Sequence, residues 1–529
     1  MILTKSKNRY EAKASFDDRH VLKAAGFRWD PNARAWWCAD ESEVERLRGF
    51  TEVSIHKEAE QPDIVIPSSW EGHPSCATDG PDDIPCPPGL SYLPYQRGGI
   101  AYARGRAGVL IADMPGLGKT IQAIGCMNDE SVKTALVICP ASLKLNWQRE
   151  IDKWLNYYLP VHVVDKAAHP IPRSLGILIV NYDIVAKMRP RLDAVEWDVL
   201  ICDESHLLKT PTTSRCKAVL GKDGKGGIRA KRRIFLTGTP AESRPAELFT
   251  VANALRPDLF PSWLDYAFRY CGAWMGKYGL EAKGATRVSE LQAVMRENFM
   301  VRRMKADVLK DLPAKIRVRV TLPCDKKLRE KVDEELKAYQ RERQCIESLK
   351  REGASSEEVF RARNAANSRM HDLRRSTTAG KMPMAMEFVK NAADAEKVVI
   401  FAKHHIVLDA LIKEFGDAAV VVTGKVAVND RQRAVDRFQS DPDCRVFIGQ
   451  IDAAGTGITL TASSHVIFLE FDWRPGVMEQ AEDRAHRIGQ LDSVTCSYLV
   501  IENSLDDVML SSVNNKRNTL NETLDIQPS

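Results

Sequence analysis

The sequence contains no long apolar run, and its N-terminus shows no export signal. No stretch of the 529 residues approaches the roughly 18 consecutive apolar residues of a membrane span. The first ten residues, MILTKSKNRY, lack the apolar core of a signal peptide. We therefore expect a protein without a membrane partner that works in the cytoplasm.

The twelve cysteines include no C-x-x-C pair, and charge of neither sign dominates. Cys139, Cys202 and Cys496 fall inside apolar runs, as buried reduced thiols of a cytosolic-type compartment do. The net charge of +5 arises from 76 basic and 71 acidic residues. This balance permits a polyanionic partner but does not require one.

The first part of the chain divides into a small unit, residues 1–50, and a segment rich in proline, residues 51–88. The prolines, with SS, DG and PPG turns, predict a linker there. His73, Cys76 and Cys86 lie close together within it and raise the possibility of zinc. A fourth ligand is missing, so the sequence disfavours a metal site.

Two series of short apolar runs occupy the rest of the chain. The first series is GVLIAD, TALVICP, ILIVNYD, DVLICDE and RRIFLTGT, and the second is KVVIFA, AAVVVTG, CRVFIGQ, HVIFLEF and TCSYLVI. Continuous runs of this length, separated by helix-length stretches, are typical of parallel strands covered by helices on both faces. The prediction is an α/β fold with two tandem parallel-sheet lobes. We place the lobes at 89–305 and 306–529, with a charged helical insertion at about 325–380.

The stretch VLIADMPGLGKT (109–120) predicts a strand, a loop and a helix that begins near Lys119. Gly116 and Gly118 would let backbone N–H groups turn inward around a phosphate, and the helix N-terminus adds its dipole. Lys119 would reach the β- and γ-phosphates, and Thr120 would ligate Mg²⁺. A chance GLGKT turn is the alternative, which the flanking strand and helix make improbable. The sequence therefore predicts a nucleotide site for ATP and Mg²⁺.

A carboxylate pair ends the run DVLICDESH. Asp203 would serve as the second Mg²⁺ ligand, and Glu204 would orient and deprotonate the attacking water. Acidic residues at a strand end also cap helices. The phosphate-binding loop upstream favours the catalytic interpretation.

Arg484 and Arg487 lie three positions apart in AEDRAHRIGQ (481–490), a spacing that would place both on one helix face. Two parallel guanidiniums repel each other unless an anion lies between them. Glu482 and Asp483 could pair with them on a solvated face, whereas the planar guanidinium also matches phosphate oxygens. The motif alone leaves both interpretations open.

The ordered motifs resemble the Swi/Snf ATPase family of superfamily-two helicases, from residue 90 to the C-terminus. They are LPYQRGGI, DMPGLGKT, ICPASLKLNWQREIDKW, DESH, LTGTP, AGTGITLT and QAEDRAHRIGQ. Gln96 matches the family's adenine-reading glutamine. Asp113 stands where generic phosphate-binding loops have glycine and matches the family's aspartate, whereas Met114 and Pro115 depart from the family.

Other segments resemble the annealing-helicase (HARP) branch of the family, which remodels forks and rewinds DNA. These segments are LTGTPAESRPAELF, FMVRRMKADVLKDLPAK and AGKMPMAMEF. The compact chain leads us to expect a bacterial or phage protein, in a bacterial or infected host cell.

The resemblance implies two RecA-like lobes and a role for both arginines. Arg484 and Arg487 would be arginine fingers that the second lobe presents to the γ-phosphate held by Lys119, neutralising charge that develops during transfer. They fit only when the lobes close, so ATP would drive closure and hydrolysis would release it. The catalytic set is then Glu204, Arg484 and Arg487.

The resemblance also nominates contacts to nucleic acid. The candidates are Ser142, Lys144, Thr237, Lys403, Gly455, Thr456 and Trp473. For Ser142 and Thr237, capping or turn hydrogen bonds are an equal alternative. Tryptophans such as Trp473 more often pack in a core than stack on a base.

Residues 1–50 offer separate information. FDDRHVLKAAG predicts a short helix that begins after Asp17 or Asp18 and stops at Gly26. FRWDPNARAWWCAD predicts a hairpin, and three of the ten tryptophans fall within it. Most of this aromatic surface must form the core of so small a unit, although the interleaved arginines could help the rings to stack on bases. The pattern resembles the HARP module, which directs its relatives to junctions between single strands and duplex.

We therefore predict a monomeric, ATP-dependent translocase on double-stranded DNA that remodels or anneals structures such as forks. One alternative is an RNA-acting helicase of the same superfamily. The other is an ATP-gated DNA clamp without motor activity.

Overall fold

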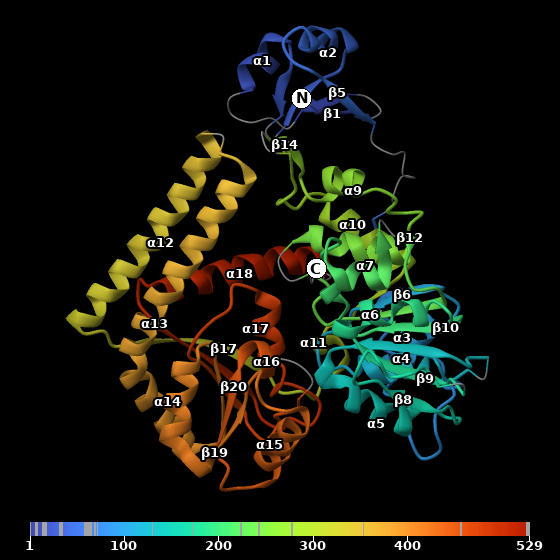
Figure 1. The fold of residues 1–529 in the computed structure, drawn as a ribbon, viewed down its shortest axis with the longest axis vertical. Helices are drawn as coiled ribbons and strands as arrows, with labels where there is room; N and C mark the ends of the chain where they lie inside the picture. The colour runs from blue at the N-terminus through green and yellow to red at the C-terminus, as the bar shows by residue number, and fades with distance from the viewer. Residues whose placement is uncertain are drawn as a thin grey trace.

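Parallel β-sheets form the two largest units of the chain, which the computed structural model shows as neighbouring lobes (Figure 1). The structure describes residues 2–5, 9–12, 18–30, 35–57, 66–67, 70, 72–129, 131–172, 174–222, 225–241, 244–276, 279–352, 354–454 and 458–524.

The first lobe has an all-parallel sheet in the order β16-β6-β13-β10-β7-β9-β8. The strands are β6 (Gly108–Ile111), β7 (Ala135–Cys139), β8 (Val161–Val163), β9 (Ile177–Asn181), β10 (Trp197–Cys202), β13 (Ala230–Leu236) and β16 (Met300–Val301). The five apolar runs of the first series are β6, β7, β9, β10 and β13, which confirms the predicted lobe. Strands β8 and β16 lie at the edges and are too short to give a signal of their own.

Helices cover both faces of this sheet. They are α3 (Pro94–Ala103), α4 (Lys119–Gly125), α5 (Lys144–Trp154), α6 (Tyr182–Leu192), α7 (Ser214–Leu220), α8 (Phe249–Leu255), α9 (Trp263–Tyr270) and α10 (Val288–Asn298). In β7, Leu136 and Ile138 pack in one apolar cluster while Ala135 and Val137 pack in the other. Neighbouring residues of a strand point to opposite faces, so a strand buried on both sides is apolar throughout.

The second lobe repeats this architecture with the strand order β17-β22-β21-β18-β20-β19, again all parallel. Its strands are β17 (Lys315–Leu322), β18 (Val398–Ala402), β19 (Ala419–Val422), β20 (Val446–Gln450), β21 (His465–Phe468) and β22 (Val494–Ile501). Its helices are α14 (His405–Phe415), α15 (Val428–Ser440), α16 (Ile451–Ala454), α17 (Pro475–Glu482) and α18 (Leu505–Leu524). All five runs of the second series are strands, so the tandem α/β fold is confirmed.

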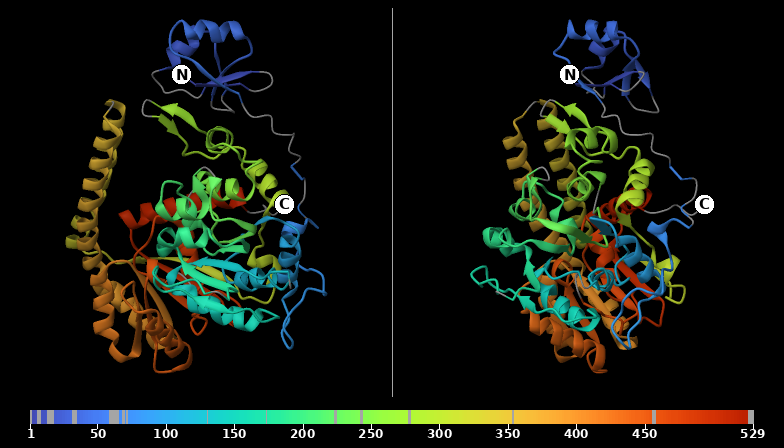
Figure 2. Two further views of the ribbon diagram at one scale, coloured as in Figure 1. Left: turned by 45° about the vertical axis from the view of Figure 1, so that its right-hand side comes forward. Right: turned by 90° about the vertical axis from the view of Figure 1, so that its right-hand side faces the viewer.

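The predicted charged insertion is a hairpin of two long helices, α12 (Lys326–Glu352) and α13 (Ser356–Ala395). It projects from the second lobe towards the end of the molecule that holds the N-terminus (Figures 1 and 2). Helix α13 continues past the predicted end of the insertion, because Ala385 and Val389 pack into the second-lobe core.

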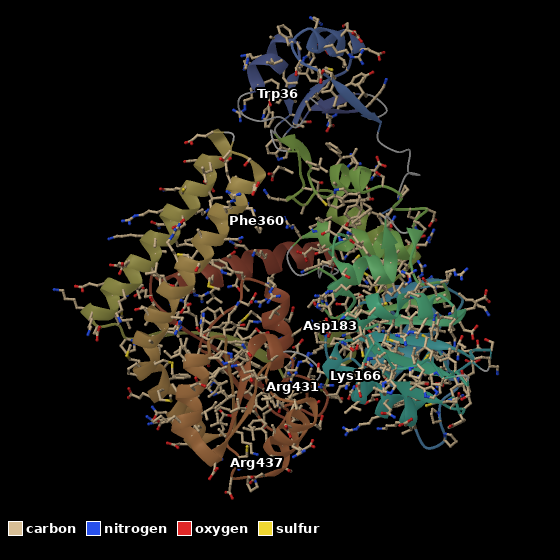
Figure 3. The ribbon with its side chains drawn as sticks, in the orientation of Figure 1. Trp36, Lys166, Asp183, Phe360, Arg431 and Arg437 are labelled. Atoms are coloured by element: carbon tan, nitrogen blue, oxygen red, sulfur yellow. The ribbon has the colours of Figure 1, made fainter. Side chains whose placement is uncertain are left out.

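A mixed sheet and two helices form the N-terminal unit. Its elements are β1 (Ile2–Lys5), β2 (Tyr10–Ala12), α1 (Arg19–Ala24), β3 (Arg28–Asp30), β4 (Ala35–Cys38), α2 (Glu41–Arg48) and β5 (Ser54–Lys57). The predicted helix is α1, followed by Gly26 at a φ of +99°, and the predicted hairpin pairs β3 with β4. Strand β5 pairs with β1, so the unit extends past residue 50. Figure 3 shows Trp36 within it.

Part of the segment predicted as a linker packs against the first lobe instead. The backbone oxygen of Ser75 accepts a hydrogen bond from Arg302 N at 3.1 Å, and the oxygen of Pro85 accepts one from Asn128 Nδ2 at 3.3 Å. His73 Nδ1 accepts from Ser75 N, and Cys76 Sγ lies 3.3 Å from an Arg296 nitrogen. The segment from residue 72 to 88 therefore packs on the surface of the first lobe and is not a flexible linker. No helix in the described part of the chain is long and apolar enough to cross a membrane.

Candidate active site between the two lobes

The loop between β6 and α4 has the shape of a phosphate cradle. Gly116 and Gly118 have φ values of +89° and +72°, which glycine adopts without strain. A side chain at Gly118 would also collide with Gln96, since its Cβ would lie 2.4 Å from Gln96 Nε2. Helix α4 begins at Lys119, as predicted, and Lys119 Nζ donates to the backbone oxygens of Asp113 and Met114 at 2.9 and 3.3 Å.

Asp113, the departure from a generic phosphate-binding loop, is a buried anchor. Its Oδ1 accepts hydrogen bonds from Arg303 N at 3.0 Å and from Arg303 Nε at 2.9 Å, and its Oδ2 accepts from Gln122 Nε2 at 2.8 Å. Arg303 also donates to the backbone oxygen of Tyr95. Asp113 and Arg303 have side-chain exposures of 0% and 1%, so their ion pair is shielded from water and salt. The start of the loop is thereby bound to the segment that follows β16.

Asp203 and Glu204 follow β10 and face the same loop. Asp203 Oδ2 accepts from Trp147 Nε1 at 2.8 Å, and Asp203 Oδ1 accepts from the backbone N of Glu204 at 2.9 Å. Glu204 adopts a left-handed φ of +49°, which costs energy in a residue other than glycine. Its Oε2 makes no hydrogen bond within the described part of the chain, although His206 Nδ1 lies 3.3 Å away. A strained backbone thus directs a carboxylate into the cavity.

The protonation of these groups is set by burial and by their neighbours. Burial and the adjacent Glu204 raise the pKa of Asp203 to about 6. Burial also opposes ionisation of Glu204, but His206 and Lys119 outweigh it and lower the pKa of Glu204. Burial lowers the pKa of Lys119 against the pull of Glu204 and Asp113. Glu204 is therefore the carboxylate that stays ionised and can accept a proton.

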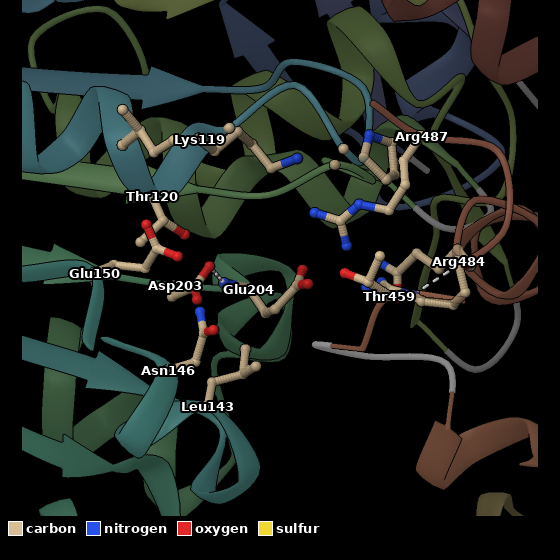
Figure 4. A pocket seen from close by; sticks show the side chains of 16 residues that line it. Lys119, Thr120, Leu143, Asn146, Glu150, Asp203, Glu204, Thr459, Arg484 and Arg487 are labelled. Carbon is tan, nitrogen blue, oxygen red and sulfur yellow. Dashed lines mark hydrogen bonds between the residues drawn. The ribbon is translucent and has the colours of Figure 1, made fainter. Parts of the chain in front are cut away.

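The second lobe closes the cavity with Arg484 and Arg487, which enter from the side opposite Lys119, Thr120 and Asp203 (Figure 4). The cavity has a volume of about 240 Å³. Pockets for whole drug-sized ligands have volumes of roughly 300–1,000 Å³. This smaller cavity, lined by Lys119, Arg484 and Arg487, is suited to the phosphate groups of a nucleotide.

The two arginines do not lie on a helix face, contrary to the sequence expectation. Helix α17 ends at Glu482, and turns carry the chain onward. Arg484 Nη1 and Arg487 Nη1 both donate to the oxygen of Ile458, at 3.5 and 3.3 Å, which aligns them. Burial and the adjacent Arg487 lower the pKa of Arg484 to about 10. Both side chains still point the same way, because they donate to the same acceptor, the backbone oxygen of Ile458.

Within the described residues, Arg484 and Arg487 make no ion pair with Glu482 or Asp483, contrary to the alternative interpretation of local ion pairs on a solvated face. Glu482 pairs with Lys315 and Arg317 at 2.8 and 2.7 Å, and both Glu482 and Asp483 are fully buried. Arg484 is only 8% exposed. One buried and one partly exposed guanidinium that face a phosphate-sized cavity are suited to bind an anion.

The remaining nucleotide candidate, Gln96, is buried beneath the loop and does not line the cavity. Its Oε1 accepts from Leu93 N at 3.0 Å, and its Nε2 lies 3.4 Å from Leu117 O. These contacts support the shape of the loop. Adenine recognition by Gln96 stays a prediction.

The nucleic-acid candidates have varied surroundings. Lys144 is buried and donates to Val164 O and Asp165, and Thr237 is buried against His206. Their side chains have internal partners, so phosphate contacts by them stay a prediction. Ser142 is partly exposed in the turn before α5.

On the second lobe, Lys403 pairs with Asp472 at 3.0 Å, and Trp473 stacks on Tyr339 of α12 with ring centroids 6.0 Å apart. Trp473 therefore packs against the helical hairpin here. Gly455 and Thr456 lie outside the described residues.

Sequence reasoning missed several residues of the site. Gln480 Nε2 donates to Thr239 Oγ1 at 3.0 Å across the lobe boundary. Asn146 and Glu150 of α5 also line the cavity. Their spacing of four residues along one helix face was a usable signal, whereas the Gln480 contact depends on how the lobes meet.

A phosphate cradle, an acidic pair and two trans-lobe arginines define a two-lobe nucleoside triphosphatase. Residues 51–379 match the SNF2-related domain, residues 380–489 match the helicase conserved C-terminal domain, and residues 8–38 match a domain of unknown function. The chain belongs to the SNF2 family, and it is a DNA-dependent ATPase of the helicase class.

Named relatives agree with this assignment. The chain is 33% identical over 511 residues to the SWI/SNF-related matrix-associated actin-dependent regulator of chromatin subfamily A-like protein 1 homolog of Caenorhabditis elegans, covering 93% of this chain and 71% of that protein. It is 35% identical over 481 residues to the DNA annealing helicase and endonuclease ZRANB3 of Homo sapiens, covering 87% and 43%. The chain thus spans less than half of the human relative.

Among solved structures, the Sulfolobus solfataricus SWI2/SNF2 ATPase core in complex with dsDNA is similar at 24% identity, with a TM-score of 0.40, over 83% of this chain and 98% of that one. The bacterial or phage origin expected from the sequence stays a prediction.

Proposed function

We propose that the chain is an ATP-dependent translocase on double-stranded DNA that remodels or anneals branched structures such as forks. The observation that carries the motor assignment is the cavity in which Arg484 and Arg487 of one lobe face Lys119 and Glu204 of the other. Such a site is complete only when both lobes contribute, so hydrolysis and lobe movement are coupled. The similarity to a relative that is named a DNA annealing helicase supports the fork assignment.

The residues of the first lobe fit ATP with Mg²⁺. Asp203 is a buried carboxylate beside a second one, Glu204, and burial together with that neighbour raises the pKa of Asp203 to about 6. Thr120 lies beside it in the first turn of α4. Asp203 and Thr120 would hold the cation, which when bound supplies charge neutralisation at the phosphates.

Glu204 would take the proton from the attacking water. Its lowered pKa keeps it ionised at neutral pH, and its Oε2 makes no hydrogen bond within the described residues. Lys119 would bind the β- and γ-phosphates in the ground state. Arg484 and Arg487 would stabilise the charge that builds up on the γ-phosphoryl oxygens during transfer.

Movement on DNA would follow from closing and opening of the lobes. Duplex lying across both lobes would be gripped through Ser142, Lys144, Thr237, Lys403, Gly455, Thr456 and Trp473. Each cycle of ATP binding and hydrolysis would shift one set of contacts relative to the other. We further propose that the chain acts as a monomer.

The N-terminal unit would select the DNA structure. Trp29 is 47% exposed and lies 5.8 Å from Trp36, while Trp37 has Arg9 and Arg28 near its ring at 5.6 and 5.9 Å. An exposed aromatic ring is suited to stack on an unstacked base, and arginines elsewhere on the same small sheet are suited to a backbone. Junctions between single strands and duplex offer both features.

The experiment that tests the function compares ATP hydrolysis with single-stranded, duplex and forked DNA and with RNA. The proposal expects the strongest stimulation by forked or duplex DNA. Stimulation by RNA alone would identify an RNA helicase, and DNA binding without turnover would identify a clamp.

The matched variants are Glu204→Gln and Lys119→Ala. Glu204→Gln should retain ATP while turnover falls on the order of a hundredfold or more, because only the general base is lost. Lys119→Ala should weaken ATP binding itself. Wild-type turnover in Glu204→Gln would show that another group activates the water.

A further inference from the structure

Lys305 is a buried lysine whose ammonium group bonds only to the segment that carries the two arginines, within the described residues. It begins the short helix α11 (Lys305–Val308) at the end of the first lobe and is 4% exposed. Its Nζ lies 2.9 Å from Asp483 Oδ1 and 3.5 Å from His486 Nδ1, and it donates to the backbone oxygen of His486. An ammonium has three hydrogens, so these acceptors complete its bonding.

The ring of His486 is oriented to accept from Lys305. His486 Nε2 lies 2.8 Å from the oxygen of Pro313, and a carbonyl oxygen only accepts, so Nε2 carries the proton. In the neutral ring, Nδ1 is then the acceptor that faces Lys305. The turn after α17 is thus held by the chain that joins the lobes, at Asp483 before Arg484 and at His486 between Arg484 and Arg487.

The other side of Lys305 is bound to the phosphate-binding loop. Met114 N donates to Arg303 O at 3.2 Å, and Lys305 N lies 3.5 Å from Met114 Sδ. A Cβ built on Gly116 would lie 3.0 Å from Arg487 Cβ and 3.6 Å from Lys305 Cε. Gly116 of the phosphate-binding loop, Lys305 and Arg487 therefore lie next to one another.

We propose that Lys305 is a positioning residue that holds residues 483–487 against the phosphate-binding loop, so that Arg484 and Arg487 face the phosphates. The inference rests on the proposed role of the two arginines. Lys305 acts through them and is absent from the lining of the cavity. A buried ion pair such as Lys305–Asp483 adds little to the free energy of unfolding, but it can favour one arrangement of the two segments over others.

The charge of Lys305 provides an independent readout. Four groups face it: Asp483 and His486 from the turn after α17, Glu479 from α17, and Lys315 from β17. Burial lowers the pKa of Lys305 to about 8, against the opposing effect of Asp483. Above that pH the ammonium loses its proton and the ion pair is lost, so turnover should fall.

The first test measures DNA-stimulated ATP turnover in Lys305→Met, with Lys310→Met as the control. Lys310 is an exposed lysine that follows the same short helix. Lys305→Met should lower kcat on the order of a hundredfold, the effect of a misplacement of about 1 Å, with the KM for ATP changed by less than about threefold. Lys310→Met should match the wild type. Wild-type kcat in folded Lys305→Met would overturn the inference.

The second test compares the pH dependence of kcat in the wild type and Lys305→Arg. A guanidinium keeps its charge, so the fall in rate above about pH 8 should move to higher pH. A fall that stays at the same pH in Lys305→Arg belongs to another group and overturns the inference. This comparison also decides the matter if Lys305→Met does not fold, which its thermal unfolding reveals.

The third test combines Lys305→Met with Arg487→Ala. If Lys305 acts through the arginines, the double variant should be about as slow as Arg487→Ala alone. Fully multiplied losses would contradict positioning. Wild-type turnover in Arg484→Ala and Arg487→Ala would refute the proposed hydrolysis mechanism itself, whereas slow arginine variants beside a fast Lys305→Met refute only the role of Lys305.

Discussion

Buried charge is the feature of individual residues that most distinguishes this site from an ordinary surface motif. Asp113, Asp483 and Glu482 are fully buried, and each has at least one cationic partner. Removing one partner of a buried pair leaves an uncompensated charge in a medium of low polarity. The loop and the arginine turn should therefore be sensitive to single neutral substitutions.

Arg303→Met tests this sensitivity at the phosphate-binding loop. The variant leaves the buried carboxylate of Asp113 without its guanidinium partner. Its free energy of unfolding should therefore fall by about 3–5 kcal/mol. The control is Lys231→Met, because Lys231 pairs with Asp198 at 2.8 Å but is 72% exposed, and its urea unfolding should stay close to that of the wild type. Urea unfolding of both variants measures the difference. Equal small losses would mean that Asp113 does not depend on Arg303.

Arg484→Ala and Arg487→Ala test the anion site. ATP affinity and DNA binding should stay nearly unchanged, because the first lobe holds the ground state. The rate of single-turnover hydrolysis with saturating DNA should fall roughly a thousandfold or more for the more direct finger, which we expect to be Arg487. Lysine should rescue poorly, since a point charge cannot reproduce the planar fork. Normal rates in both variants would leave the second lobe without a catalytic role.

At the scale of helices and strands, the apolar runs identified the strands and the charged insertion identified a helical hairpin, whereas an exposed edge strand and the turn after α17 were missed. All ten runs became strands, because a strand covered on both faces must be apolar throughout. Strand β17 escaped detection since its side chains are mostly exposed and it pairs only with β22 at the sheet edge. The sequence around Arg484 also predicts a helix, but α17 ends at Glu482 and a turn follows. The contacts that hold this turn come from residues far away in the sequence, such as Lys305 and Ile458, so the local pattern could not reveal it.

Glu470 joins two strand ends and gives the second lobe a defined acid sensitivity. Its Oε2 accepts from the backbone nitrogens of Lys403 and His404 at 2.7 and 2.8 Å, and His404 Nδ1 donates to Oε1. Burial alone would raise the pKa of Glu470, but these hydrogen bonds outweigh it and lower the pKa to about 2. The loop after β18 is thereby tied to the end of β21.

The expected result is a pH-dependent loss of stability. A depressed carboxyl pKa stabilises the fold above the ordinary value of about 4.5, and this contribution is lost as pH falls towards about 2. Between those limits Glu470 should account for about 1–3 kcal/mol of the loss. Chemical unfolding at a series of pH values, in wild type and Glu470→Gln, isolates it from other carboxylates. Identical slopes in the two proteins would contradict the assignment.

At the scale of the whole molecule, the two lobes and the presence of a nucleotide site could be predicted because each motif is local. The closure of the site could not, since Gln480–Thr239 and Lys305–Asp483 join residues far apart in the chain. Nothing in the local sequence around Lys305 distinguishes it from an exposed lysine. Which charged residues are buried is decided only when the second lobe packs against the first.

The N-terminal unit is set apart from both lobes at one end of the molecule (Figure 2), so its contribution can be separated from catalysis. Removal of residues 1–57, the full extent of its sheet, should leave ATPase stimulation by duplex DNA within about twofold of wild type, since no described residue of the unit lines the cavity. Preference for forked over duplex DNA should disappear.

A point substitution sharpens this test. Trp29→Ala should reduce the fork preference, because the ring is 47% exposed beside Trp36 and removing one stacked base contact costs about 1–3 kcal/mol. Phe50→Ala is the matched control, since Phe50 is 60% exposed in the same unit and its ring contacts no tryptophan or arginine within the described residues. The measurement is the ratio of ATPase rates with forked and duplex DNA at saturating ATP. If the deletion slowed turnover equally on every ligand, the unit would support the first lobe structurally and would not select the DNA.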